Sequence, residues 1–346
     1  MEVSQKEYTE HIERLHFELQ EAWASDERVH ALKLAIQCAK LLGEPSLPEF
    51  YPAMFVLTTE VLDTFGRLVY ERIRCKAHDE VRGVGLHERR SFNKSCVVKK
   101  LFALSDASWT SSAVCADAKE TCRNWFYKTA CIRELLPRFY VEVALLRCYR
   151  FLSDGELPSI LARLGSVARG IGDPLVALYA RCYLARAGGD VAPRHAAYCV
   201  TIFHDYLFCF QEIRTLKFQT HLRKLHLTEQ QYLRLTEPAV QWLLECLHRA
   251  RATLEDYESV LAHYRDYCND ASVLKVESSV LKKHQLHTRL RDSIFKEVWW
   301  RYIYSKSGSS SRSSPSDAMT PIILALEYTL ELSYRIETFC GRSMKT

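Results

Sequence analysis

Apolar residues recur every three or four positions along most of this chain, the spacing that places side chains on one face of an α-helix. The first such stripe runs through Tyr8, Ile12, Leu15, Leu19 and Trp23. A second stripe, over residues 29–42, comes after the polar pair Ser25-Asp26, and Gly43 then supplies a helix stop. We predict that the two stripes form an antiparallel helical hairpin.

Helical spacing continues beyond this hairpin, and the content of Gly (12) and Pro (10) is low for 346 residues. Consecutive helical pairs of unequal length are typical of an α-solenoid, in which each pair buries its face on the next. The predicted fold class is therefore all-α, an α-solenoid of HEAT-like antiparallel helical hairpins. The further predicted helices cover about residues 51–73, 117–136, 138–152, 158–167, 175–187, 193–213, 238–247, 253–267 and 271–303.

Glycine-rich and serine-rich interruptions divide the predicted array. Residues 76–116 contain Gly83, Gly85 and a Ser/Thr-rich run, which predicts a flexible insertion rather than a packed helix. A serine-rich linker of the kind that cannot pack precedes the last apolar segment. The predicted domains are the N-terminal hairpins (1–75), the insertion (76–116), the continuing solenoid (117–304), the linker (305–316) and a C-terminal helix (317–346).

Residues 133–152 combine a proline with a wide apolar band, which predicts a helix that packs on more than one side. Proline lacks an amide proton and its ring clashes with the preceding turn, so we expect one helix to stop or kink at Pro137 and a second to restart at once. Arg138 lies at this break, where its guanidinium could satisfy freed carbonyl groups or reach a partner carboxylate. The alternative is a kinked core helix with a solvated arginine.

Composition and charge narrow the class of protein. Hydrophobic residues make up 48% and charged residues 26%, which suits a globular chain. A formal charge of +5, from 47 basic and 42 acidic residues, is too small for the basic surface that nucleic-acid binding requires. The first residues lack the apolar core of a signal peptide, and no apolar run reaches bilayer thickness. We therefore expect a cytoplasmic protein that does not bind nucleic acid.

Cysteine and histidine spacings do not predict a metal site. The 13 cysteines include no Cys-x-x-Cys pair, and His221 and His226 lack the spacing of a helical ligand pair. Buried, reduced thiols are the expected state. The helical cysteines to which this applies are Cys38, Cys148, Cys182, Cys199 and Cys246.

The segment Gly170-Ile171-Gly172-Asp173-Pro174 could be interpreted as a phosphate-binding loop of a helical enzyme. It lacks a G-x-G-x-x-G pattern, a following Lys-Ser or Lys-Thr and a preceding strand. We favour a loop in which Asp173 caps the next helix and Pro174 takes its first position. Because no Ser-His-Asp order, nucleophile elbow, paired carboxylate site or HExxH helix occurs either, we predict no catalytic residue and no cofactor.

Three segments, together with a weaker similarity to about Asn269, resemble one protein family. That family is the vacuolar protein sorting-associated protein 35-like proteins, large solenoid subunits of the retriever complex in the Commander assembly and relatives of the retromer large subunit. The segments are residues 5–42 with Glu21-Ala22-Trp23-Ala24-Ser25-Asp26, residues 50–73 with Leu62-Asp63-Thr64-Phe65-Gly66, and residues 118–152 followed by 169–176 and 179–181.

The resemblance implies a non-catalytic scaffold, peripheral on endosomes, that recycles transmembrane cargo to the plasma membrane. The implied partners are an arrestin-fold subunit, a small phosphodiesterase-fold subunit, a COMM-domain and coiled-coil assembly, and a sorting nexin that presents cargo. In the retromer large subunit, a Pro-Arg-Leu-Tyr-Leu segment supports the arrestin-fold partner. The implied partner-binding residues here match it with two conservative changes and are Pro137, Arg138, Phe139, Tyr140 and Val141.

The chain departs from the family in two regions, residues 76–116 and the residues after about Lys282. The family's solenoid continues much further, and its distal part holds the phosphodiesterase-fold subunit. We therefore expect a truncated or alternatively spliced form, for which the resemblance supports binding of the arrestin-fold subunit more than binding of the phosphodiesterase-fold subunit. A different class of function is the alternative, a peripheral phosphoinositide or membrane-surface binder that uses the basic residues between Arg82 and Lys100.

Overall fold

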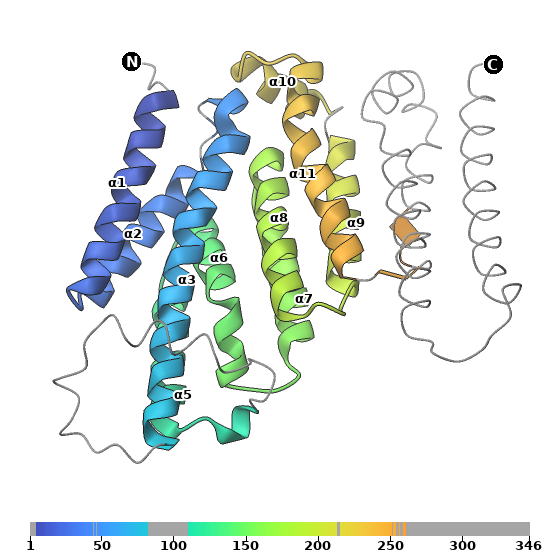
Figure 1. Cartoon of the computed structure of the whole chain (residues 1–346). Coiled ribbons are helices and arrows are strands. Elements are labelled where there is room, and N and C mark those ends of the chain that lie inside the picture. Colours follow the sequence, from blue (N-terminus) through green and yellow to red (C-terminus); the bar gives the residue numbers. More distant parts are fainter. Residues whose placement is uncertain are drawn as a thin grey trace, which may run out of the picture. The chain divides into compact units, whose positions relative to one another are not determined.

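The computed structural model describes residues 5–81 except 44 and 46, residues 110–212, and residues 215–260 except 251, 254, 255, 257 and 258. All regular structure in these ranges is helical (Figure 1). The chain forms two compact units, Met1–Ile171 and Gly172–Thr346. The boundary between them falls inside the segment 117–304, which we predicted as one continuing solenoid.

Unit 1 (Met1–Ile171) begins with the predicted hairpin. Its α-helices are α1 (Gln5–Ala24), α2 (Arg28–Leu41), α3 (Tyr51–Val81), α5 (Ala116–Ala130), α6 (Leu135–Ala144) and α7 (Leu157–Ala168). Short 3-10 helices cover Pro48–Phe50, Ser111–Ala113 and Leu146–Phe151. The predicted helices over 51–73 and 158–167 are also confirmed, although α3 continues to Val81, into the segment that we predicted as an insertion.

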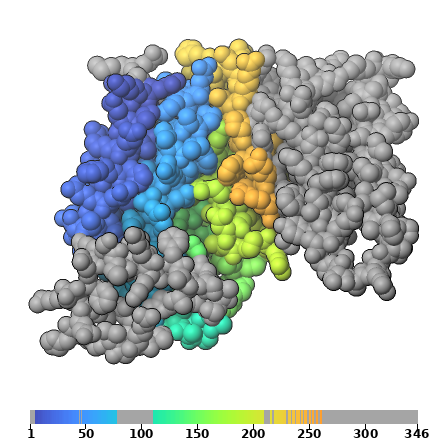
Figure 2. All heavy atoms as spheres, in the orientation of Figure 1, coloured from blue at the N-terminus to red at the C-terminus, as the bar shows by residue number. Residues whose placement is uncertain are grey.

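Each helix of unit 1 packs against at least one other helix of the unit. α1 packs against α2 and α3, α3 against α5, and α2 against α6, which also contacts α3, α5 and α7. In the space-filling view, α1 and α3 lie in contact along one face of the unit (Figure 2). Because α6 is surrounded by four other helices, the predicted packing of residues 133–152 on more than one side is confirmed.

An aromatic cluster joins α1, α3 and α5. The ring of Trp23 stacks on Trp125 at a centroid distance of 6.0 Å, and Phe65 meets both rings edge-on. The Arg28 guanidinium lies 4.1 Å from the centroid of the Trp23 ring and also pairs with Asp26 at 2.6 Å. The turn between α1 and α2 is therefore fixed by a cation–π contact and an ion pair as well as by apolar burial.

Unit 2 (Gly172–Thr346) has a central helix, α8 (Pro174–Val191), that packs against α9 (Ala197–Glu212) and α11 (Glu229–Arg249). The short helix α10 spans Leu216–Lys224. The buried hydroxyl of Tyr179 on α8 donates a hydrogen bond of 2.8 Å to the carbonyl oxygen of Leu235 on α11. The Tyr198 hydroxyl on α9 donates one of 3.0 Å to the carbonyl oxygen of Ala185.

Two predicted helix boundaries in unit 2 are wrong. Gly188 and Gly189 were expected to end α8, but the helix passes through both. Gly188 has a packing role instead, because its missing side chain leaves room for the Tyr198 ring of α9. A β-carbon at Gly188 would lie 2.7 Å from the Tyr198 side chain. Pro238 was expected to begin a helix, but it lies inside α11, which starts at a Thr228–Gln231 capping box instead.

These findings confirm the all-α fold class, with antiparallel helices packed side by side as in an α-solenoid. In the part of the chain that the structure describes, no helix is both long enough and apolar enough to cross a membrane.

Candidate functional site

The predicted partner-binding segment forms the first half of α6, and the expected break at Pro137 is wrong. The preceding helix α5 already ends at Ala130, and α6 begins at Leu135, so Pro137 lies in the first turn. Amide groups there have no acceptor within the helix, so a proline removes no hydrogen bond. The first hydrogen bond of α6 runs from the Arg138 amide to the carbonyl oxygen of Glu134, at 3.2 Å.

Four of the five predicted residues belong to the core. Pro137 is buried, and the exposed fractions of Phe139, Tyr140 and Val141 are 1%, 0% and 0%. The rings of Phe139 and Tyr140 also meet edge-on, with centroids 5.9 Å apart. In unit 1 these four side chains hold α6 against its neighbours, which leaves Arg138 as the member of the segment that can offer polar atoms to another molecule.

Arg138 is half-buried, and its side chain has no hydrogen bond or ion pair with any described residue. The two glutamates four residues away, Glu134 just before α6 and Glu142 on α6, are engaged elsewhere. Glu134 pairs with Lys40 of α2 at 2.5 Å. Glu142 pairs with Arg163 of α7. A half-buried guanidinium without a carboxylate is costly, because burial removes part of its hydration without replacing it.

The pairing of Glu142 belongs to a small network that the sequence did not predict. The Tyr149 hydroxyl donates to the Glu142 carboxylate at 2.7 Å, and the Tyr149 ring stacks on Phe126 with centroids 3.9 Å apart. Burial, followed by the nearby carboxylate, raises the pKa of Tyr149 well above its ordinary value. The two residues lie on different elements, Glu142 on α6 and Tyr149 on the 3-10 helix Leu146–Phe151, so no helical spacing in the sequence predicts this contact.

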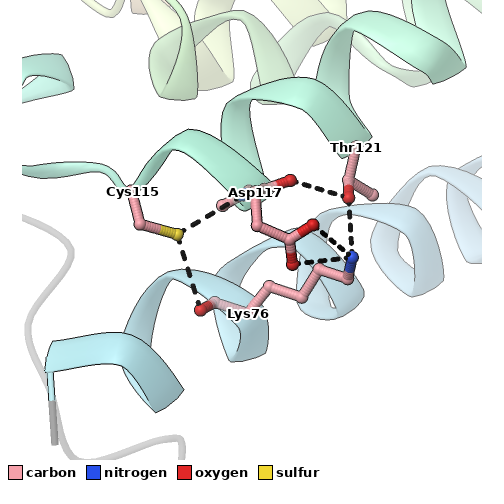
Figure 3. Close-up of polar contacts among 5 residues, drawn as sticks. Lys76, Cys115, Asp117 and Thr121 are labelled. Atoms are coloured by element: carbon pink, nitrogen blue, oxygen red, sulfur yellow. Dashed lines mark hydrogen bonds and ion pairs between the residues drawn. The ribbon is translucent and has the colours of Figure 1, made fainter. Parts of the chain in front are cut away.

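A second polar cluster joins the last turns of α3 to the start of α5 (Figure 3). The Lys76 ammonium lies 2.9 Å from Oδ2 of Asp117 and 2.9 Å from Oγ1 of Thr121. Cys115 caps α5, because its sulfur accepts a hydrogen bond from the Ala118 amide at 3.3 Å and approaches the Lys76 carbonyl oxygen at 3.8 Å. We call the three contacts that join Lys76 to Asp117, Thr121 and Cys115 the Lys76 clasp.

The glycine-containing loop before α8 is occupied in the way that we favoured. The carboxylate of Asp173 accepts hydrogen bonds from the amides of Leu175 and Val176, at 2.9 and 3.0 Å, and Pro174 takes the first helical position. The other oxygen of Asp173 lies 3.1 Å from Nε2 of His221. Because a side-chain carboxylate already fills the anion site of this helix, a phosphate-binding role for the loop finds no support.

Cysteines of the described ranges are free thiols, and the helical ones named above are buried, as predicted. Burial raises the pKa of the Cys38 and Cys122 thiols to about 12 each. Over the same ranges, no group of three or more histidine, cysteine or acidic side chains is placed to hold a metal ion.

Other sequence-based predictions concern residues outside the described ranges. They are the basic residues between Arg82 and Lys100, most of the insertion, most of the helix over 253–267, the helix over 271–303, the linker 305–316 and the C-terminal helix 317–346. These remain predictions.

Comparison with known proteins identifies relatives of this chain. The curated VPS35 endosomal protein-sorting factor-like protein of Homo sapiens is 40% identical over 296 residues, which cover 85% of this chain and 28% of the relative. The protein of the same description from Dictyostelium discoideum is 39% identical over 282 residues, with coverages of 80% and 26%. That from Drosophila melanogaster is 38% identical over 285 residues, with coverages of 81% and 26%.

The chain thus spans less than a third of the length of these curated relatives. A family model described as VPS35L matches residues 1–235. This match includes the three segments on which the resemblance rested, so the resemblance is confirmed. Because the matched residues make up well over half of its length, the chain belongs to the VPS35L family.

Proposed function

We propose that this chain is a non-catalytic scaffold subunit of a retromer-like retriever complex, which recycles transmembrane cargo from endosomes to the plasma membrane. The relatives are described as endosomal protein-sorting factors, which supports a role in endosomal sorting. The chain acts in the cytoplasm, peripherally on endosomes, and its helices supply surfaces rather than a reaction centre.

One observation carries the assignment of the binding site. Arg138 is the half-buried, unpaired cation of a segment whose other members are buried in unit 1. In the proposal, Arg138 contacts the arrestin-fold subunit directly. Pro137, Phe139, Tyr140 and Val141 contribute by fixing the position of α6 beneath it.

The proposed assembly includes further partners of this scaffold. A COMM-domain and coiled-coil assembly and a sorting nexin that presents cargo would join it through other parts of the complex.

Co-precipitation with the purified arrestin-fold subunit tests the site. The variant Arg138→Ala should reduce capture strongly, because removing one member of a desolvated charge pair costs roughly 2–5 kcal/mol. Arg123→Ala, which removes an exposed arginine from α5, is the matched control and should bind as the unaltered chain does. Equal capture by a folded Arg138→Ala variant would refute the site, and no capture by the unaltered chain would refute the proposed partner.

A further inference from the structure

The net positive charge of this chain is concentrated in and around one short helix of unit 2, α10 (Leu216–Lys224). Residues 213–228, which include α10, contain four lysine or arginine residues, two histidines and no acidic residue. They account for +4 of the formal charge of +5, so the rest of the chain, with 43 basic and 42 acidic residues, is almost neutral. We propose that the exposed side of α10 is a contact surface for an anionic lipid membrane.

One side of α10 is used for packing inside unit 2. Phe218 and Leu222 lie four residues apart, hence on one face of the helix, and their exposed fractions are 6% and 2%. The Phe218 ring meets the Tyr232 ring of α11 edge-on, with centroids 5.0 Å apart. Apolar contacts therefore hold α10 at the end of α11 where that helix begins (Figure 1).

The opposite side of α10 carries exposed cations. Thr220, Arg223 and Lys224 are all exposed, and their spacing of three and four residues places them on one face. Neither Arg223 nor Lys224 has a side-chain hydrogen bond or ion pair with a described residue. The helix is thus fixed by its apolar face and presents two unneutralised charges to solvent on the other.

The carboxylate that contacts α10 does not neutralise these two cations. Asp173 lies 3.1 Å from Nε2 of His221, and it also accepts two amide hydrogen bonds at the start of α8. Arg223 comes two residues after His221, so the helix directs it away from this carboxylate. The charge of the exposed side therefore remains available to an anion outside unit 2.

The character of this surface favours a membrane over other anionic partners. The apolar residues of α10 face α11, whereas the centre of a protein interface normally offers exposed aromatic or aliphatic anchors. A nucleic acid requires a longer basic track to release enough counterions. Four or more lysine and arginine residues clustered on an amphipathic helix suit anionic lipid headgroups, where each strengthens attachment about fivefold.

This contact goes beyond the proposed function, which requires no lipid binding by the chain itself. Attachment through one small basic cluster is weak and reversible. Within a complex that other subunits already hold at the membrane, however, a weak second contact adds to the overall affinity because it forms at high effective concentration.

Co-sedimentation of the full chain with lipid vesicles tests the inference without any partner protein. The vesicles contain phosphatidylcholine with about 30% phosphatidylserine, and pure phosphatidylcholine vesicles are the neutral reference. The variant is Arg223→Gln/Lys224→Gln, in which glutamine keeps the helix propensity and removes the charges. The matched control is Lys33→Gln/Arg67→Gln, which makes the same change at exposed residues of α2 and α3 that have no ion pair with a described residue. Circular dichroism should show all three proteins to be equally helical.

The unaltered chain should sediment with the anionic vesicles and not with the neutral ones, and raising NaCl from about 50 mM to about 300 mM should release it. The α10 variant should bind at least about tenfold more weakly, whereas the control should change by less than about threefold. Equal binding by the α10 variant, or no binding by the unaltered chain, would overturn the inference while leaving capture of the arrestin-fold subunit unaffected. Capture of the unaltered chain, but not of the variant, by immobilised polyglutamate in the absence of vesicle binding would assign the surface to an acidic protein segment instead.

Discussion

A β-carbon on Gly66 would lie 2.1 Å from the carbonyl oxygen of Ala144, far inside van der Waals contact. Gly66 lies in the middle of α3, and Ala144 is the last residue of α6. The backbones of the two helices therefore touch at this point, which is where α6 ends and the 3-10 helix Leu146–Phe151 begins. The position of α6, and with it that of Arg138, depends on the absence of one side chain.

We predict that Gly66→Ala destabilises unit 1 by about 1–3 kcal/mol, the usual cost of inserting a methyl group where backbone must move. Thermal unfolding followed by circular dichroism would measure the change. Gly165→Ala is the matched control, because a β-carbon at Gly165, inside α7, meets nothing within 4 Å. That control should gain up to about 1 kcal/mol from the better helix propensity of alanine. If both variants shift the midpoint in the same direction, the close contact between α3 and α6 is wrong.

The cap of α8 gives a second prediction. Asp173→Ala removes the acceptor for two backbone amides and the contact with His221, so unit 2 should lose about 1–2 kcal/mol. Asp173→Asn keeps an oxygen for capping but loses the charge, and should fall between the two proteins. Urea unfolding of all three proteins would establish this order. An asparagine variant as unstable as the alanine variant would show that the charge, not the hydrogen bonds, matters most.

The thiols should differ in reactivity according to burial. Cys131 is exposed at the end of α5, whereas the pKa of the buried Cys38 and Cys122 is raised to about 12. The thiolate is the reactive form, so at about pH 8 only on the order of one part in ten thousand of these buried thiols is ionised. Brief treatment with N-ethylmaleimide followed by peptide mass spectrometry should label Cys131 before Cys38 and Cys122. Equal labelling before denaturation would contradict the described burial.

Arg181 provides a prediction about stability in the core of unit 2. Its exposed fraction is 2%, and neither its Nε nor its Nη1 atom has a hydrogen-bond partner. Replacing a buried charge with an apolar side chain of similar volume is often stabilising, by about 1–4 kcal/mol for buried pairs. Arg181→Met should therefore raise the unfolding midpoint. A clear fall in the midpoint would mean that the guanidinium has a partner beyond the described residues.

Sequence alone predicted those helices whose boundaries are set by local chemistry. The Asp173-Pro174 start of α8 is an example, because a cap and a first-turn proline act within a few residues. The helix boundaries at Pro137 and Pro238 were predicted wrongly. A proline indicates where a helix is interrupted only when the start of that helix is known. At Gly188, the determining contact is the Tyr198 ring from another helix, which no local pattern records.

Some features of the candidate site could likewise be predicted from the sequence, and others could not. The match of residues 137–141 to a family segment could be found from sequence. The half-buried state of Arg138 and the engagement of Glu134 and Glu142 with lysine and arginine of other helices depend on tertiary packing. Exposure, rather than motif membership, therefore decides which residue of the segment can touch a partner.

The Lys76 clasp has a practical consequence. It joins the end of α3 to the start of α5 through side chains that lie outside residues 82–109. The entropy of closing a loop grows only with the logarithm of its length, so lengthening a connection whose ends are already joined costs little. The Lys76 clasp should therefore keep the end of α3 beside the start of α5 when the chain between the two helices is lengthened, for example by an inserted fluorescent domain.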